Sequence, residues 1–251
     1  MPIVNPNRNP MNRNKPTVRA LILDFGGTID TNGCHWGKML WHAYRKANLP
    51  IDEQQFRQAY IHAERTLESN PLIAPDYTFG QTLDVKLRLE LEQLCIMGAL
   101  DADEATLERL RQQIAETLYR QTATTIDRNR RMLTALHTRF PMALVTNFYG
   151  NMQQVLSEFR LDYLFEILVE SSVVGIRKPD TRIFKAAIAA FGLPPKNILA
   201  VGDSFYKDVE PARKLGCQTA WLKGEGWTDK IYDERIPTYI LTDLTQLEHI
   251  L

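Results

Sequence analysis

Residue types that can carry out chemistry recur directly after short apolar stretches of this 251-residue chain. Asp24 follows the apolar run 18–23 and begins the five-residue sequence DFGGT. Comparable positions are held, in chain order, by Thr146 and Asn147 after 142–145, Lys178 after 166–169, and Asp203 and Asp208 after 197–201. Ligands of open parallel sheets gather beyond the carboxyl ends of the strands. If these stretches are parallel strands, we expect their polar side chains to share one site.

The chemistry that this set favours is phosphoryl transfer. The carboxylate of Asp24 can attack phosphorus and form an aspartyl-phosphate. Three carboxylates at one sheet edge repel one another unless a cation neutralises them, and hard oxygen ligands of this kind favour Mg²⁺. Lys178 would place a positive charge against both the nucleophile and the substrate phosphate, while the Thr146 hydroxyl and the Asn147 amide would bind phosphoryl oxygens. We therefore expect Mg²⁺ as the cofactor and a small phosphorylated metabolite as the substrate.

Composition excludes several other classes of protein. Thirty basic and thirty acidic side chains give a formal net charge of zero, which argues against a nucleic-acid partner because such surfaces need a basic excess. No apolar run approaches the length of a membrane span, so we expect no membrane contact. Cys34, Cys95 and Cys217 are odd in number and unpaired in spacing, so they fit reduced thiols in a cytoplasmic protein better than a disulfide framework or a metal site. Residues 1–17 lack the apolar stretch of a signal peptide and are expected to form a loose tail.

The pattern from residue 33 to residue 123 is helical throughout. Apolar residues recur at steps of three and four over 83–94 and again over 107–118. Asp103 precedes the second run and is suited to cap it. The segments 35–46 and 52–68 are predicted to form two more helices, broken by the prolines at positions 50 and 71.

From about residue 128 short apolar strands alternate with helices of roughly ten residues. The predicted strands are 142–145, 166–169, 197–201, 218–222 and 239–241, and the predicted helices are 129–138, 151–159, 181–191 and 209–215. This alternation is typical of an α/β fold with a doubly wound, mainly parallel sheet. The opening strand, 18–24, belongs to that sheet. Residues 18–32 and 124–251 are therefore predicted to form a Rossmann-like core, into which an all-helical cap domain, 33–123, is inserted.

Together these motifs resemble those of the haloacid dehalogenase (HAD) superfamily of phosphohydrolases over about residues 18–222. In this resemblance DFGGT is the first motif with Asp24 as nucleophile, Thr146 is the second, Lys178 the third, and Asp203 with Asp208 the acidic fourth. The resemblance implies a Rossmann-like core with a helical cap of the first (C1) type. It also implies that Asp24, the backbone carbonyl of Gly26 and Asp203 hold Mg²⁺, with Asp208 assisting.

The sequence departs from the family pattern at position 26. The usual phosphatase has an aspartate there, which protonates the leaving group and then activates water, whereas Gly26 keeps only the carbonyl ligand. General acid–base catalysis contributes about 10²–10⁴-fold. We expect the loss of this acid to lower the rate most for substrates with poor leaving groups, such as the alkoxides of sugar phosphates, and less for acyl or aryl phosphates. A cap residue or a bound water would be a substitute. Asp30 is a candidate, although a turn or flap role fits its distance from Asp24 better.

Two other classes of function stay open. One is cleavage of a carbon–halogen or carbon–phosphorus bond within the same superfamily. The dehalogenase branch does without metal, which the acidic pair Asp203 and Asp208 argues against, and phosphonate cleavage through a Schiff base would need a cap lysine such as Lys38 or Lys46. The other is non-catalytic binding of a phosphorylated ligand or a partner protein. Gly26 favours it, and the retained motif residues oppose it.

The cap is expected to supply specificity, so the predicted helix 35–46 should face the substrate. The candidate contacts on it are His35, Trp36, Trp41, His42 and Tyr44. Amphipathic packing would explain most of them. The two histidines lie seven residues apart on one helix face, but without a third ligand they make a poor zinc site.

Overall fold

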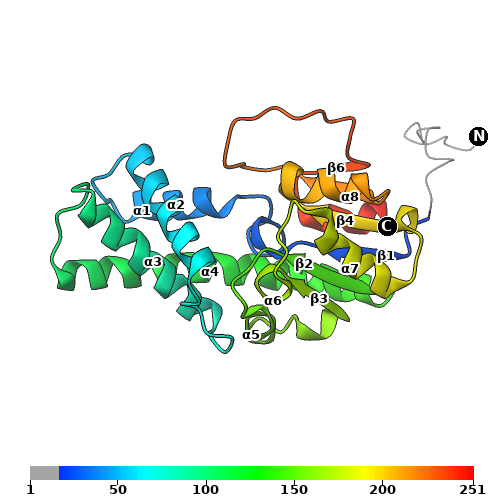
Figure 1. Cartoon of the computed structure of the whole chain (residues 1–251), viewed down its shortest axis with the longest axis horizontal. Helices are drawn as coiled ribbons and strands as arrows, with labels where there is room; N and C mark the ends of the chain where they lie inside the picture. Colours follow the sequence, from blue (N-terminus) through cyan, green and yellow to red (C-terminus); the bar gives the residue numbers. More distant parts are fainter. Residues whose placement is uncertain (1–16) are drawn as a thin grey trace, which may run out of the picture.

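A computed structural model describes residues 17–251, so the predicted tail over residues 1–17 lies, apart from Thr17, outside the described part. Six strands form one sheet in the order β3-β2-β1-β4-β5-β6, and every neighbouring pair is parallel (Figure 1). They are β1 (Ala20–Leu23), β2 (Met142–Thr146), β3 (Ile167–Glu170), β4 (Ile198–Gly202), β5 (Gln218–Leu222) and β6 (Tyr239–Leu241). The predicted doubly wound parallel sheet is confirmed.

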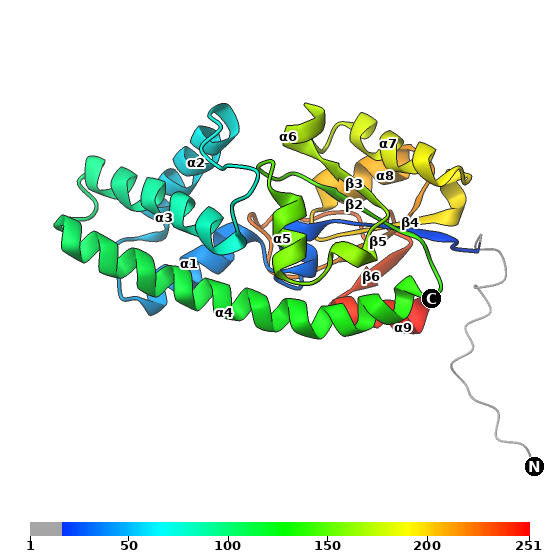
Figure 2. The same cartoon turned by 90° about the horizontal axis from the view of Figure 1, so that it is seen from below.

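Helices cover both faces of the sheet because its strands carry apolar residues on both sides. In β1, Leu21 and Leu23 pack with α4, α5 and α9, whereas Ala20 and Ile22 pack with α7 and α8. Figure 2 shows these two layers on opposite sides of the strands. The bounds are α4 (Glu104–His137), α5 (Met152–Glu158), α7 (Thr181–Phe191), α8 (Glu210–Lys214) and α9 (Leu247–Ile250). The strands are thus buried from both sides, as parallel sheets are.

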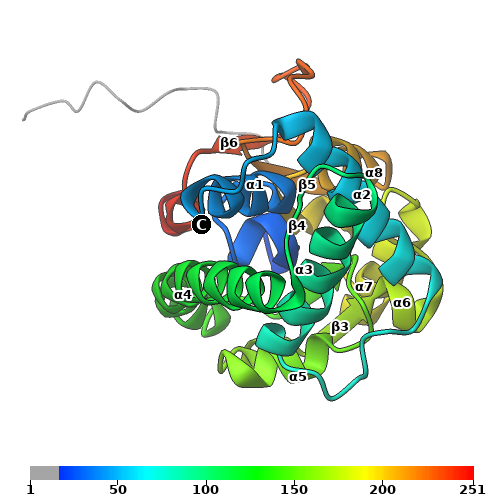
Figure 3. The same ribbon diagram turned by 90° about the vertical axis from the view of Figure 1, so that its left-hand side faces the viewer.

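The segment between β1 and β2 is helical, as predicted. It contains α1 (Trp36–Lys46), α2 (Glu53–Ser69), α3 (Phe79–Ile96) and the whole of α4. The helical block, residues 33–123, comprises α1, α2, α3 and the first part of α4. Capping boxes formed by Asp52 with Gln55 and by Thr78 with Gln81 begin α2 and α3. Figures 1 and 3 show α1, α2 and α3 beyond the end of the sheet, so this block covers the carboxyl ends of the strands.

Helix α4 is one continuous helix of 34 residues. The sequence prediction of a separate helix over 129–138 is therefore wrong. No glycine or proline interrupts residues 104–137, so nothing in the chain breaks the helix between its two apolar runs. The amide of Asn129 donates to the carbonyl of Ile29 at 2.8 Å and ties the second half of α4 to the core. The predicted domain boundary at residues 123 and 124 falls inside this helix and stays a prediction.

Short helical turns follow the two strands that carry the acidic motifs. The turn Phe25–Ile29, in which Gly26 and Gly27 have non-helical backbone angles, follows β1, and a π-helical turn, Phe205–Val209, follows β4. The remaining short elements are α6 (Ser171–Val174) and the 3₁₀ turns Asp162–Leu164, Pro195–Asn197 and Leu244–Gln246. Within residues 17–251 no helix has both the length and the apolar character needed to cross a membrane.

Candidate active site

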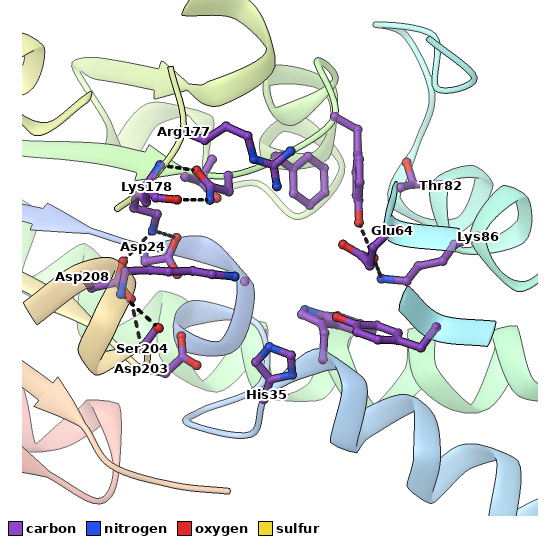
Figure 4. Close-up of a pocket in the computed structure, with 18 of the residues that line it drawn as sticks. Asp24, His35, Glu64, Thr82, Lys86, Arg177, Lys178, Asp203, Ser204 and Asp208 are labelled. Atoms are coloured by element: carbon purple, nitrogen blue, oxygen red, sulfur yellow. Dashed lines mark hydrogen bonds and ion pairs between the residues drawn. The ribbon is translucent and has the colours of Figure 1, made fainter. Parts of the chain in front are cut away.

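The predicted site residues meet at the carboxyl edge of the sheet. Asp24 directly follows β1, Thr146 ends β2, Lys178 lies in the loop before α7, and Asp203 and Asp208 follow β4. All five line one pocket between the sheet edge and the helical block. Figure 4 shows Asp24, Lys178 and Asp208 close together on one wall of that pocket. The roles of these residues stay predictions, but the fold brings the set together.

The ammonium group of Lys178 joins two of the carboxylates. Its Nζ lies 2.6 Å from Oδ1 of Asp24 and 2.6 Å from Oδ1 of Asp208. Burial alone would lower the pKa of Lys178, but the carboxylates of Asp208 and Asp24 outweigh burial and hold that pKa above its usual value. Lys178 is therefore a buried positive charge beside the expected nucleophile.

Three carboxylates share this single ammonium group. Burial, opposed by Lys178 and reinforced by Asp208, raises the pKa of Asp24 to about 6. Burial also raises the pKa of Asp203 well above its usual value, and repulsion from Asp208 and Asp24 adds to the rise. Oxygen atoms of the three aspartates lie within 4.8 Å of one another. An all-oxygen donor set with excess negative charge fits a hard divalent cation such as Mg²⁺, which Asp24, Asp203 and Asp208 would hold.

The two glycines after Asp24 differ in what the backbone requires of them. Gly27 has a φ of +91°, and a Cβ there would lie 2.4 Å from Cγ of Asp203, so no larger residue fits. Gly26 has an ordinary φ of −70°. A Cβ on Gly26 would meet only Trp36, at a van der Waals distance of 3.6 Å from Cδ1. The absence of an acid at position 26 is therefore not imposed by the backbone or by crowding of Cβ.

Asp30 has a structural role close to the expected nucleophile. Its Oδ1 accepts from the backbone N–H of Gly27 at 2.8 Å, and its Oδ2 accepts from Nε1 of Trp36 at 2.7 Å. Burial raises the pKa of this carboxyl to about 7. Asp30 does not line the pocket. It holds the turn after β1 against the ring that covers Gly26, which agrees with the turn role expected from the sequence rather than with a substitute acid.

Asn147 is engaged differently from its predicted role. Its side-chain amide donates to the carbonyl of Lys178 at 3.1 Å and accepts from the backbone N–H of Lys178 at 2.9 Å. These two bonds hold the loop that carries the lysine. Asn147 also lines the pocket, and its contact with a substrate stays a prediction.

The wall of the pocket opposite Asp24 and Lys178 is formed by residues of the helical block, the predicted cap, that the sequence did not single out. Lys86 of α3 forms an ion pair with Glu64 of α2, and the hydroxyl of Tyr149 donates to Oε1 of Glu64 at 3.0 Å. Burial would lower the pKa of Lys86, but Glu64, together with Tyr149, Tyr60 and Glu90, outweighs burial and raises that pKa well above its usual value. Figure 4 shows Glu64 and Lys86 across the pocket from Asp24 and Lys178. Further lining residues missed from the sequence are Tyr60, Phe79, Thr82, Arg177 and Lys207.

A signal for this wall is present in the sequence of α3. Lys86 and Glu90 stand at steps of three from Leu83 and Leu87, on the leucine face of the helix. Both are buried. Charged residues are almost never fully buried unless they are paired. The positions of Lys86 and Glu90 therefore predict that residues of other elements pair with them.

The candidate contacts on the first cap helix divide into two groups. His35 and Trp36 line the pocket. Of the others, Trp41 packs against Phe56, His42 is exposed, and Tyr44 is buried within the helical block. Amphipathic packing, the alternative raised by the sequence, explains Trp41 and Tyr44.

Sequence comparison relates the chain to known hydrolases. The family model for haloacid dehalogenase-like hydrolases matches residues 18–216. A glyceraldehyde 3-phosphate phosphatase of Pyrococcus furiosus is 37% identical over 93 residues, 36% of this chain and 38% of that protein. A phosphoserine phosphatase of Thermus thermophilus is 39% identical over 82 residues, 32% of this chain and 33% of that protein. The matched regions thus span little more than a third of these phosphatases.

Longer matches and solved structures extend the same relationship. The haloacid dehalogenase-like hydrolase domain-containing protein 3 of Homo sapiens is 26% identical over 205 residues, 78% of this chain and 76% of that protein. The HAD-hydrolase YfnB of Bacillus subtilis, solved bound to magnesium, has a TM-score of 0.58 at 21% identity, covering 94% of this chain and 99% of its own. The L-2-haloacid dehalogenase RSc1362 has a TM-score of 0.60 at 19% identity, with coverages of 94% and 99%. These structures share the fold, and a fold alone does not select the reaction.

Proposed function

The chain belongs to the haloacid dehalogenase-like hydrolases, and we propose that it is a Mg²⁺-dependent phosphatase acting on a small organic phosphate. The observation that carries the proposal is the group of three carboxylates, Asp24, Asp203 and Asp208, gathered around the ammonium of Lys178. This group offers a nucleophile, cation ligands and a charge partner at one point of the pocket. The phosphatases among its relatives support the same reaction class.

In the proposed reaction, a carboxylate oxygen of Asp24 attacks phosphorus. The bond from phosphorus to the substrate oxygen breaks, and that oxygen leaves as an anion, which takes up a proton from water. Water then attacks the phosphorus of the aspartyl-phosphate, which releases inorganic phosphate and restores the carboxylate. Because Lys178 contacts Oδ1 of Asp24, we assign the attack to Oδ2.

The neighbouring residues would orient the reacting groups. Mg²⁺, when bound, supplies charge neutralisation and Lewis-acid polarisation of the phosphoryl group. Asp24, the carbonyl of Gly26 and Asp203 would hold it, with Asp208 assisting. The hydroxyl of Thr28 donates to Oδ1 of Asp203 at 3.2 Å and accepts from its backbone N–H at 3.0 Å, so this carboxylate is held in place. Thr146, at the end of β2, would bind a phosphoryl oxygen.

Gly26 narrows the proposed substrate class. No acid stands at this position, and the carboxylate of Asp30 is hydrogen-bonded to Gly27 and Trp36. The first motif therefore offers no strong proton donor to the leaving oxygen. We therefore propose acyl or aryl phosphates, whose leaving groups are stable anions. The aromatic rings of Tyr60, Phe79 and Phe148, which line the pocket, suit the aryl case.

Phosphonate cleavage through a Schiff base finds little support. Neither Lys38 nor Lys46, the two cap lysines considered above, lines the pocket. Lys38 forms an ion pair with Glu53 at 2.9 Å, and Lys46 is exposed. Lys86 does line it, but its ion pair with Glu64 holds the amine protonated. A protonated amine cannot attack a carbonyl carbon.

The test is phosphate release from a leaving-group series in the presence and absence of Mg²⁺. The series runs from acetyl phosphate through an aryl phosphate to sugar phosphates. Asp24→Asn is the inactive control, and Asp162→Asn, at an exposed position outside the pocket, is the matched control. We expect Mg²⁺-dependent turnover that falls steeply as the leaving group worsens, that disappears in Asp24→Asn and that persists in Asp162→Asn.

Other outcomes point to the alternatives. Equal rates across the series would mean that another group donates the proton. Metal-independent halide release from a 2-haloacid would indicate a dehalogenase. Absence of turnover above the Asp24→Asn control on every substrate would favour a binding protein.

A further inference from the structure

A second group of metal-ligand side chains lies outside the pocket, where the cap meets the core. Cys34 precedes α1, His42 lies on the exposed side of α1, and Glu225 lies in the loop after β5. One donor atom from each of the three lies within 4.8 Å of the other two. Across residues 17–251, the only other such group is the aspartate cluster described above. The two groups differ in chemistry, because one is all oxygen and the other combines sulfur, nitrogen and oxygen.

The separations of the donor atoms are close to those of a zinc site. Nε2 of His42 lies 2.8 Å from Oε2 of Glu225, and Sγ of Cys34 lies 3.7 Å from the same oxygen. Zinc binds sulfur at about 2.3 Å and nitrogen or oxygen at about 2.0–2.2 Å, so tetrahedral ligand atoms lie roughly 3.3–3.6 Å apart. The third separation, between Sγ of Cys34 and a ring nitrogen of His42, is within 4.8 Å. Side-chain movements on the order of 1 Å would bring the three donors to the separations of a zinc site.

The backbone already holds two of the three ligands next to each other. The N–H of His35 donates to the carbonyl of Glu225 at 2.9 Å. A Cβ on Gly224 would lie 2.3 Å from the carbonyl oxygen of Gly33, so only glycine permits this close approach of the two segments. Cys34 and Glu225 are therefore positioned by main-chain contacts, and metal binding would need to order little beyond side-chain rotamers.

We propose that Cys34, His42 and Glu225 bind a zinc ion, with water in the fourth position. Thiolate, imidazole and carboxylate are the ligands that zinc uses in proteins, whereas the all-oxygen pocket suits Mg²⁺. A thiolate and a carboxylate together balance the charge of the ion. About half of the His42 and Glu225 side chains is exposed, 54% and 47%, which leaves an entry path and room for the water.

Zinc at this site would join cap and core. His42 belongs to the first cap helix, and Glu225 belongs to the core loop between β5 and β6. The same loop contacts the cap through Trp227, whose carbonyl accepts from Arg57 at 3.0 Å and whose ring stacks on His35 with centroids 5.3 Å apart. Coordination would therefore reinforce an existing contact between the loop and the cap. Binding converts the Cys34 thiol to a thiolate and releases its proton.

The test is a cobalt titration of the full chain, because a thiolate bound to Co²⁺ gives a near-ultraviolet charge-transfer band that oxygen ligands do not give. The protein is stripped with a chelator and kept in excess Mg²⁺, which competes with Co²⁺ for the aspartate site. We expect one equivalent of Co²⁺ to produce the band and Zn²⁺ to displace it. The band should disappear in Cys34→Ser, and the affinity should fall roughly tenfold or more in His42→Ala.

Matched controls are Cys95→Ser and His62→Ala, which change the same residue types outside the group. Both should keep the band and the affinity of the unaltered chain. Circular dichroism and the melting temperature establish that each variant folds, and His42→Ala at an exposed position is expected to do so. A titration without a thiolate band would overturn the proposal, and so would a band that survives Cys34→Ser. Equal loss of the band in Cys34→Ser and Cys95→Ser would overturn it as well.

Discussion

Two buried lysines line opposite walls of the pocket, and their surroundings differ. Lys178, on the core wall, contacts Asp24 and Asp208, with Asp203 close to both. Lys86, on the cap wall, is balanced by Glu64, which also accepts from Tyr149. The core wall is left with excess negative charge, whereas the cap pair is neutral. Burial of a lysine therefore does not by itself mark the reacting centre, and the charge left unbalanced around it is the better guide.

Replacing each lysine with methionine is the strongest test of this contrast. We expect Lys178→Met to lower kcat on the order of 10²-fold or more, because repulsion among the aspartates is then unrelieved and the nucleophile loses its partner. Lys86→Met should change kcat less than about tenfold and act mainly on KM. Steady-state kinetics on the best substrate of the leaving-group series measures both. Equal losses of kcat would contradict the assignment of chemistry to the core wall.

Restoring an acid at position 26 tests the core wall next. Because a Cβ fits there, Gly26→Asp should raise the rate on sugar phosphates by about 10–10²-fold and change the rate on acetyl phosphate little. Gly27→Asp is the matched control and should lose activity, since its Cβ would collide with Asp203. Rates on the two substrates give the readout. A uniform change across the series would mean that proton donation is not what Gly26 limits.

The ion pair of Lys86 and Glu64 is best tested by measuring the free energy of unfolding rather than the reaction rate. Lys86→Met should lower the free energy of unfolding by about 2 kcal/mol, because it leaves the largely buried carboxylate of Glu64 without its partner. Adding Glu64→Leu should recover most of that loss. Urea unfolding of the two single variants and the double variant closes the cycle. Additive losses would show that the two side chains do not stabilise each other.

The smallest effect is expected at Glu90, one helical turn beyond Lys86. Its Oε2 accepts from the Tyr44 hydroxyl at 2.9 Å, and burial raises the pKa of this carboxyl to about 7. The folded state thus binds this proton more tightly than the unfolded state, whose pKa is close to the ordinary 4.5. The contribution of Glu90 to stability therefore falls as pH rises from about 4.5 to 7 and is constant above that range.

Glu90→Gln removes this titration. We expect the variant to gain about 1–2 kcal/mol in free energy of unfolding at pH 8 and less at pH 5. Urea unfolding at the two pH values measures the difference. Glu92→Gln, at an exposed position on the same helix, should show no such pH dependence. If both variants behave alike, Glu90 does not titrate as its burial requires.

Much of the fold was predictable because the signals are local. Strand β5, strand β6 and helix α7 have the predicted bounds, since apolar runs and turn residues mark them. The error in α4 arose where a polar stretch separates two apolar runs, because such a stretch looks like a break although it contains no helix-breaking residue.

The site was predictable only on its core side. Strand ends in a parallel sheet share an edge, so the positions of Asp24, Lys178 and Asp208 in the chain already implied that they meet. Lys86 pairs with Glu64 of α2, which also accepts from Tyr149 in the loop after β2, and no spacing rule connects these segments. The group of Cys34, His42 and Glu225, which we propose as a zinc site, was not found from the sequence for the same reason, because Glu225 lies far along the chain. His35, the residue considered beside His42, is not part of this group.

Local patterns in the chain were enough to predict the family, the parallel sheet and the order of the acidic motifs, because periodicity and strand-end position are properties of short segments. Three features of the site follow from the packed structure alone: Gly26 has room for a side chain, Asp30 is hydrogen-bonded to Trp36, and Glu64 balances the charge of Lys86. Those outcomes depend on distances between residues far apart in the chain. Such distances are set when helices and strands pack against one another, and they cannot be derived from the properties of one segment.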